Sequence, residues 1–92
     1  MRFDTRPDAN QREIIEAAQA LGVVVRNVSW AGRGLLDLIC ADWTGTWIVD
    51  CKSKYNQLTG PQKEWLKDWP GDWYIWRSAE DVVETVKKRR AK

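Results

Sequence analysis

Apolar residues recur at helical spacing near the start of this chain and then in short blocks of β-branched residues. Between Asn10 and Leu21 they repeat every three or four positions, which predicts a helix. Asp8 or Asn10 can cap the start of this helix, and Gly22 can end it. Residues 23–28 are mostly valine and predict a strand. The chain is therefore expected to open with a helix and a strand.

Two longer apolar blocks follow a glycine-containing loop at residues 29–34, where Gly32 and Gly34 permit unusual backbone angles. Residues 35–41 and 46–52 predict two strands, joined by a turn at 42–45. Both blocks are apolar on both faces except at a few charged positions. Such strands are expected to lie inside a sheet that is covered by helices.

The second half of the sequence predicts a helix, a strand and a last helix. Thr59 is a good N-cap, and Gln62 stands three residues later, where a capping-box partner belongs. This helix should end before Pro70, and residues 72–76 predict a fourth strand. A last helix is expected from Ser78 to about Arg89. The order α-β-β-β-α-β-α predicts an α/β fold with a central sheet flanked by helices.

The length of 92 residues allows one domain, with a core at about 8–86 and a basic tail at 87–92. The net charge of +2 neither requires nor excludes a nucleic-acid partner. The tail could contact phosphates, or it could be a frayed, solvated helix end. Both interpretations stay open at this point.

The absence of histidine excludes several kinds of chemistry. A Ser-His-Asp triad and a Cys-His pair are impossible. The sequence contains no phosphate-binding glycine loop, so no nucleotide cofactor is expected. Cys40 and Cys51 show no zinc-binding spacing, and two cysteines without a signal peptide do not predict a disulfide. With no apolar stretch of membrane-span length, we expect a soluble protein of the cytoplasm and no membrane partner. Any catalysis must use carboxylates, lysines and a metal ion.

Charged residues stand where the strand pattern favours apolar ones. Asp50 and Lys52 project from the same face of their predicted strand, and Asp37 lies among leucines in the strand before it. A carboxylate among apolar side chains is costly unless it is paired or binds a metal. Two converging carboxylates with a nearby lysine suit a Mg²⁺ or Mn²⁺ site. The alternative is a simple ion pair at the strand end, with Asp37 in a turn.

These residues resemble the PD-(D/E)XK nuclease superfamily, in which an Asp on one strand precedes Asp or Glu, any residue, and Lys on the next. More closely, the chain resembles the VRR-NUC (virus-type replication-repair nuclease) branch in its short, stand-alone, phage-borne form. Five stretches in order carry this resemblance: Asp8–Ile15, Gly32–Ile39, Asp50–Lys52, Leu58–Trp65 and Arg77–Asp81. The resemblance implies a restriction-endonuclease-like αβββαβ core with a mixed sheet. It also implies a metal-dependent endonuclease that cuts DNA, with a Holliday junction or a flap as the substrate.

The resemblance assigns a role to each matching residue of the site. Asp37 and Asp50 would bind the metal, together with the backbone carbonyl of Cys51. Lys52 would be the catalytic lysine. The two remaining roles are the helix carboxylate, which falls to Glu13 with Glu16 as its rival, and the helix glutamine near the site, which falls to Gln62.

Two departures from the family pattern stand close to these residues. Leu36 precedes Asp37, where the family usually has proline, which affects the rigidity of the turn. Asp50 stands where this branch prefers glutamate, and its shorter side chain changes the depth at which a metal would sit.

Several residues around the predicted site are candidate DNA contacts. Trp30 could stack on a base, and Arg33 could bind phosphate; packing or solvation of the loop explains each equally well. Lys54 and Tyr55 could line the substrate groove, or form a plain polar loop. Family resemblance also suggests a homodimer. The competing functions are an inactive DNA-binding module and a protein-binding module that uses its seven tryptophans.

Overall fold

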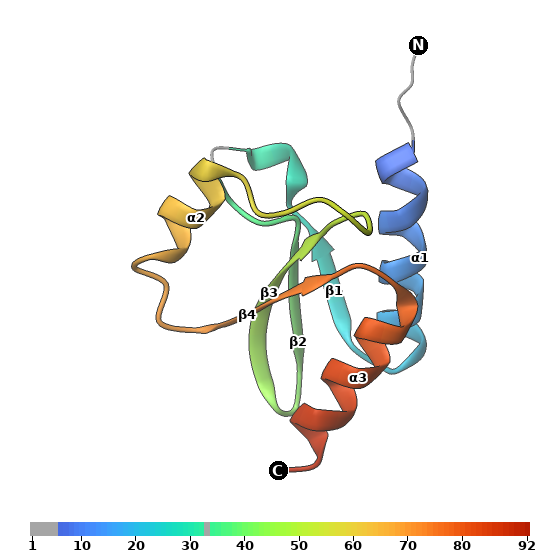
Figure 1. Ribbon diagram of the computed structural model, residues 1–92. Coiled ribbons are helices and arrows are strands. Elements are labelled where there is room, and N and C mark those ends of the chain that lie inside the picture. Colours follow the sequence, from blue (N-terminus) through green and yellow to red (C-terminus); the bar gives the residue numbers. More distant parts are fainter. Residues whose placement is uncertain (1–5, 33) are drawn as a thin grey trace.

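The computed structural model describes residues 6–32 and 34–92 (Figure 1), and for residues 6–9 it describes the backbone only. The elements in chain order are α1 (Arg6–Ala20), β1 (Val24–Asn27), the short 3-10 helix η1 (Ser29–Ala31), β2 (Leu38–Asp42), β3 (Gly45–Cys51), α2 (Gly60–Leu66), β4 (Asp72–Trp76) and α3 (Ala79–Arg90). The predicted order of helices and strands is confirmed. Among the described residues, the only added element is η1, within the loop expected at 29–34.

The four strands form one mixed sheet in the order β1-β2-β3-β4. β1 and β2 pair antiparallel, as do β2 and β3, whereas β3 and β4 pair parallel. A parallel pair needs a crossover connection, and the segment that contains α2 provides it. The predicted α/β class with a central mixed sheet and flanking helices is therefore confirmed.

The hydrophobic core lies between one face of this sheet and the pair α1 and α3. Figure 1 shows both helices on the same side of the strands, with α2 on the other side of the molecule. The core joins apolar residues from both helices and all four strands: Ile14, Ala18, Val23, Val25, Leu38, Cys40, Trp47, Val49, Trp76, Val82 and Val86. Because side chains alternate along a strand, Ile48 and Asp50 point to the opposite face of the sheet.

β2 is shorter than the sequence predicted, because it begins at Leu38 rather than at Leu35. Gly34 has φ of 85°, and a Cβ atom at this position would lie 2.5 Å from the carbonyl oxygen of Pro61. Because the chain at Gly34 passes close to the start of α2, Leu35 and Leu36 do not join the β2 ladder. Asp37 thus lies immediately before the strand and not inside it.

The start of α1 was also predicted wrongly. The helix begins at Arg6, so Asp8 and Asn10 lie within it and do not cap it. Pro7 falls in the first turn, which is the part of a helix that tolerates proline. Asn10 is therefore free to make a tertiary contact, described below.

The C-terminal end of α3 is not a frayed end, because two arginines fasten it to the turn between β2 and β3. Arg89 donates to the side chains of Asp72 at 2.6 Å and Thr44 at 2.9 Å. Arg90 donates to Asp42 Oδ2 at 3.1 Å and to the carbonyl oxygen of Leu21 at 2.6 Å. The prediction of a solvated tail is wrong for these two residues.

None of the helices within residues 6–32 and 34–92 is both long enough and apolar enough to span a membrane.

Candidate active site

The register of the sheet brings Asp37 and Asp50 together. Leu38 pairs with Val49 across β2 and β3, so one further step along the antiparallel ladder sets Asp37 opposite Asp50. Residues directly opposite in such a pair have Cβ atoms about 4.5–5.5 Å apart on the same face. The backbone of Asp37 is held in line with β1, because Val28 N donates to its carbonyl at 2.7 Å.

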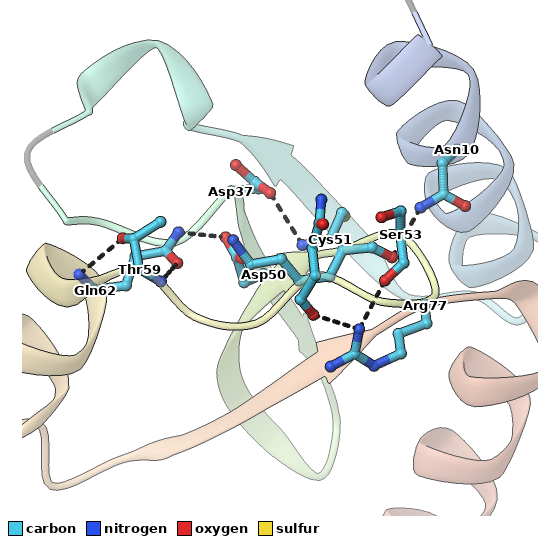
Figure 2. Close-up of polar contacts among 10 residues, drawn as sticks. Asn10, Asp37, Asp50, Cys51, Ser53, Thr59, Gln62 and Arg77 are labelled. Atoms are coloured by element: carbon cyan, nitrogen blue, oxygen red, sulfur yellow. Dashed lines mark hydrogen bonds and ion pairs between the residues drawn. The ribbon is translucent and has the colours of Figure 1, made fainter.

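Hydrogen bonds fix both carboxylates (Figure 2). The amide of Cys51 donates to Asp37 Oδ2 at 2.9 Å, and the side-chain amide of Gln62 donates to Asp50 Oδ1 at 2.9 Å. Lys52 Nζ lies 3.0 Å from Asp50 Oδ2. The Asp50–Lys52 ion pair that the sequence suggested therefore forms, but within a larger network that includes Asp37 and Gln62.

Gln62 reaches Asp50 because of the local structure at the start of α2. Thr59 is the N-cap: its hydroxyl accepts from Gln62 N, and Gln62 Oε1 accepts from Thr59 N at 3.0 Å. This reciprocal capping box holds the Gln62 carboxamide with its oxygen toward the cap and its nitrogen toward Asp50. The predicted capping box is confirmed, and it positions a residue of the candidate site.

The electrostatics of the site disfavour two negative charges. The pKa of Asp37 is raised to about 6, chiefly by burial and also by the neighbouring carboxylate of Asp50, while the hydrogen bond from Cys51 N and the charge of Lys52 act in the opposite direction. Burial, with the charges of Asp37 and Asp50, also raises the pKa of the Cys51 thiol. This thiol therefore stays neutral near pH 7 and is a poor metal ligand.

The donor atoms fit a hard divalent cation. Asp50 is 1% exposed, and its Oδ2 atom accepts no hydrogen bond of good geometry from the described residues, although the ammonium of Lys52 is near. In a strand the N–H and C=O of one residue point to the same edge, so the carbonyl of Cys51 points to the Asp37 side, where its amide donates. Two carboxylates and a carbonyl are oxygen ligands of the kind that Mg²⁺ and Mn²⁺ prefer.

The predicted helix carboxylates do not join this group. Glu13 and Glu16 are both exposed on α1. Within the described part of the chain, no three acidic or cysteine side chains lie close enough to hold one metal ion. The contact from α1 is made by Asn10, whose Nδ2 atom donates to the carbonyl oxygen of Lys52 at 3.1 Å. The structure thus brings together two of the predicted metal carboxylates, Asp37 and Asp50.

The candidate DNA-binding residues lie on exposed parts of two segments. Trp30, in η1, and Tyr55, in the loop after β3, are both exposed. Lys54 Nζ lies 5.5 Å from the centre of the Tyr55 ring. Arg33 lies outside the described residues.

The sequence interpretation missed Arg77, at the end of β4. Its Nη1 atom donates to the carbonyl oxygens of Ser53 at 2.7 Å and Asn56 at 2.6 Å, with that of Lys54 at 3.4 Å (Figure 2). One guanidinium thereby holds the loop that carries Lys54 and Tyr55. The residue stood in one of the five matching stretches, but nothing in its neighbourhood along the chain indicated these partners.

Comparison with solved structures identifies the class of fold. A structure described as a VRR_NUC domain superposes with a TM-score of 0.70 at 23% sequence identity, covering 91% of this chain and 97% of that one. The molecule thus shares its α/β fold with that structure. More specifically, it has the fold of the VRR_NUC domain, so the resemblance seen in the sequence is confirmed at the level of the fold. No family model matches the sequence, and no curated protein matches it.

Proposed function

We propose that this protein is a VRR-NUC nuclease, an endonuclease that hydrolyses DNA phosphodiester bonds with the help of Mg²⁺ or Mn²⁺. The observation that carries the proposal is the placement of Asp37 opposite Asp50, with Lys52 3.0 Å from Asp50. Two carboxylates on one sheet face carry more negative charge than the single ammonium of Lys52 balances, which favours a bound divalent cation. The VRR_NUC fold supports the same activity.

Asp37, Asp50 and the carbonyl of Cys51 are the proposed metal ligands. When bound, the ion supplies Lewis-acid activation of water and neutralises charge on the phosphate. The chain keeps the ligands in place: Cys51 N holds Asp37, and Gln62 holds Asp50. Because both anchoring groups are themselves fixed by β3 and by the capping box, the carboxylates are preorganised.

Lys52 is the proposed catalytic lysine. Its ammonium is mostly buried and lies beside the carboxylate of Asp50, so its position is set by the strand. A cation that binds Asp50 would weaken this ion pair and leave the ammonium available to the phosphate. There it would orient the attacking water and stabilise the charge that develops on the phosphate oxygens.

Glu13 is the better candidate for the helix carboxylate. Asn10 contacts the backbone of Lys52, and Glu13 follows it on the same face of α1, one turn away. Glu16 lies two turns away. At about 1.5 Å of rise per residue, Glu13 is displaced from Asn10 by roughly 4.5 Å along the helix axis and Glu16 by roughly 9 Å. We therefore assign this role to Glu13.

Trp30, Arg33, Lys54 and Tyr55 are proposed to contact the DNA around the cut. Trp30 and Tyr55 offer exposed rings for stacking on bases, and Lys54 offers a charge for phosphate. Arg77 is proposed to act indirectly, because it holds the backbone of the loop that presents Lys54 and Tyr55.

The proposal is tested by nicking of plasmid DNA with Mg²⁺, Mn²⁺ or EDTA. The variants are Asp37→Asn, Asp50→Asn and Lys52→Met, and the control is Asp68→Asn, which alters an exposed carboxylate. We expect each site variant to lose about 10²–10³-fold in rate, as for loss of a group that stabilises a transition state. Equal rates for wild type and all three variants would show that this site does not cut DNA.

A DNA-binding module without nuclease activity is the second candidate. The exposed position of Glu13 favours it, since a metal held by Asp37 and Asp50 would lack a third carboxylate. This candidate predicts retention of DNA in a gel-shift assay and no nicking with either metal. A Glu13→Gln variant separates the two cases, because the nuclease predicts a lower nicking rate for this variant, whereas the DNA-binding module predicts no nicking by either protein.

We propose that the protein forms a homodimer. Two copies acting together would account for selection of a four-way junction or a flap. Ile39, Ile48 and Trp73 form an apolar row across three strands, and Ile39 and Trp73 are partly exposed on the face away from α1 and α3. Sedimentation of the wild type and of Ile39→Glu tests this surface, since only a dimer formed through the row would be disrupted.

Comparison of the cutting rates on synthetic junctions, flaps and plain duplexes tests the selectivity for DNA structure.

A further inference from the structure

The turn between β2 and β3 presents a tryptophan that the fold does not require. Trp43 is 76% exposed at the tip of this hairpin. The turn is made by its neighbours: Asp42 Oδ1 accepts from Thr44 N at 2.8 Å and from the Thr44 hydroxyl at 2.6 Å, and Gly45 supplies a φ of 128°. These hydrogen bonds do not involve the side chain of Trp43, so a large exposed ring at this position calls for another explanation.

One face of the Trp43 ring is covered by Arg90, whose guanidinium carbon lies 4.1 Å from the ring centre. The position of Arg90 does not depend on the ring, because its guanidinium is bonded to the buried side chain of Asp42 and to the carbonyl oxygen of Leu21. The fold therefore orients Trp43 from one side and leaves most of its surface to solvent. This is the arrangement of a stacking platform with one open face.

A cavity of 860 Å³ lies against this platform, between the hairpin tip and the C-terminal end of α3. Figure 1 shows these two segments side by side, at the end of the molecule remote from α2. Besides Trp43, the cavity is lined by Tyr74 and by the cationic residues Lys88, Arg89 and Lys92. Ring surface and positive charge thus occur in one hollow.

The charge that remains in this cavity is positive. Arg89 is paired with Asp72 at 2.6 Å, and Arg90 is paired with Asp42, so these four charges cancel. The other charged residues of the lining are Lys88 and Lys92, which are both exposed, and Glu84. Two ammonium groups against one carboxylate favour an anionic ligand, and lysines bind single phosphates well.

We propose that Trp43, Lys88 and Lys92 form a second nucleic-acid contact, in which an unpaired base stacks on Trp43 and the adjoining phosphates meet the two lysines. The choice of nucleic acid as the ligand rests on the proposed function. Gly45 and Asp50 are five residues apart on β3, so the platform lies about 17 Å from the candidate active site at roughly 3.4 Å per residue. A single-stranded arm of a substrate is long enough to reach both places.

The test measures binding of a fluorescein-labelled thymidine decamer by anisotropy in EDTA, so that no cutting occurs. Trp43→Ala should weaken binding by about tenfold, a loss typical of removing one base-stacking side chain, while Trp43→Phe should keep most of the affinity. Lys88→Ala with Lys92→Ala should lower the slope of log affinity against log salt concentration, and the matched control Lys63→Ala, on α2, should leave it unchanged. Thermal melting verifies that each variant is folded.

A decamer that carries 5-iodouracil supplies an independent readout, because stacking on a tryptophan favours photo-cross-linking. We expect a cross-linked peptide that contains Trp43. Cross-links at Trp30 or Tyr55 alone, together with unchanged affinity of Trp43→Ala, would overturn the proposal. If polyglutamate displaced the decamer equally well from wild type and from Trp43→Ala, the proposal would also be overturned, since decamer binding would then be electrostatic only.

The outcome is separable from that of the nuclease proposal. A wild type that nicks plasmid DNA, with a Trp43→Ala variant that binds the decamer equally well, refutes this contact and leaves the activity intact. If the wild type never nicks DNA but replacement of Trp43 abolishes decamer binding, the result supports the contact and refutes the activity.

Discussion

The Asp37 carboxyl should destabilise the metal-free protein at neutral pH, and Asp37→Asn should therefore stabilise it. Asparagine has nearly the same shape and keeps an oxygen that can accept from Cys51 N, which now bonds Asp37 Oδ2 at 2.9 Å. It removes the negative charge that burial and the neighbouring Asp50 disfavour. The substitution thus isolates the electrostatic cost of the site from its packing.

The magnitude follows from the pKa of Asp37. Its value of about 6 exceeds the ordinary 3.8, because burial is the largest influence. At about 1.4 kcal/mol per pH unit the full difference would be roughly 3 kcal/mol, and solvent screening at this partly exposed group reduces it to about 1–2 kcal/mol. A domain of this size gains about 4–8 °C in Tm per kcal/mol, so we expect a rise of roughly 4–16 °C at pH 7.5 in EDTA.

The sign and the pH window are fixed by the same shift. Because the folded pKa is raised, the folded chain takes up a proton between pH 6 and about 3.8 while the unfolded chain does not. The cost of ionised Asp37 is therefore present above pH 6 and fades as the pH falls through this window. The gap in Tm between variant and wild type should shrink accordingly, and should vanish near pH 4.

Thermal melts in EDTA at several pH values measure this gap. Asp68→Asn is the matched control, since Asp68 is exposed, and it should shift the Tm little at any pH. A variant no more stable than wild type at pH 7.5, or a gap that does not change with pH, would refute the reasoning. Added Mg²⁺ should raise the Tm of the wild type more than that of Asp37→Asn, because only the wild type offers both carboxylates.

Three further substitutions test how the site and the fold are held together. Arg77→Ala should free the loop at residues 53–56, and amide hydrogen exchange there should speed up by at least about tenfold. Gln62→Glu keeps an acceptor for the capping box but replaces the donor to Asp50 with a negative charge, so both the nicking rate and the Tm should fall. Arg89→Ala should cost about 2–3 kcal/mol in urea unfolding, since the partly buried hydroxyls of Thr44 and Tyr74 lose a charged donor.

Each of these substitutions has a control or a contrary result. Arg26→Ala removes a guanidinium that, among the described residues, bonds the adjacent carbonyl of Val25 alone, so it should leave exchange in the loop unchanged. Gln62→Ala loses both contacts and should lower the Tm as well as the rate; an unchanged Tm would mean that the capping box contributes nothing. Lys88→Ala should cost far less than Arg89→Ala, and equal costs would refute the role given to Arg89.

The elements that the sequence predicted correctly were those set by local chemistry. A short apolar block rich in β-branched residues identified β3, and the spacing of Thr59 and Gln62 identified the capping box that begins α2. These signals act within one strand or one helical turn, so the chain itself carries them. The placement of Asp50 and Lys52 on one face follows from the strand period alone.

The contacts that the sequence did not reveal join residues far apart along the chain. Asn10 meets Lys52 across 42 positions, and Arg90 meets Asp42 across 48. The run of cations in α3 was visible, but the carboxylates and carbonyls that receive Arg89 and Arg90 were not. For the same reason the late start of β2 escaped prediction, because it depends on the passage of Gly34 past Pro61.

The shorter carboxylate at position 50 has a physical explanation in the packing. Asp50 is 1% exposed, and its two oxygens already lie 2.9 Å from Gln62 and 3.0 Å from Lys52. A glutamate, with one more methylene, would have to displace Gln62, and through the capping box it would shift the start of α2. In a site this closely packed the extra volume costs stability before it brings the carboxylate nearer to a metal. Asp50 and the position of α2 are therefore matched, and the departure from the glutamate that the resembled VRR-NUC branch prefers is compatible with the proposed metal site.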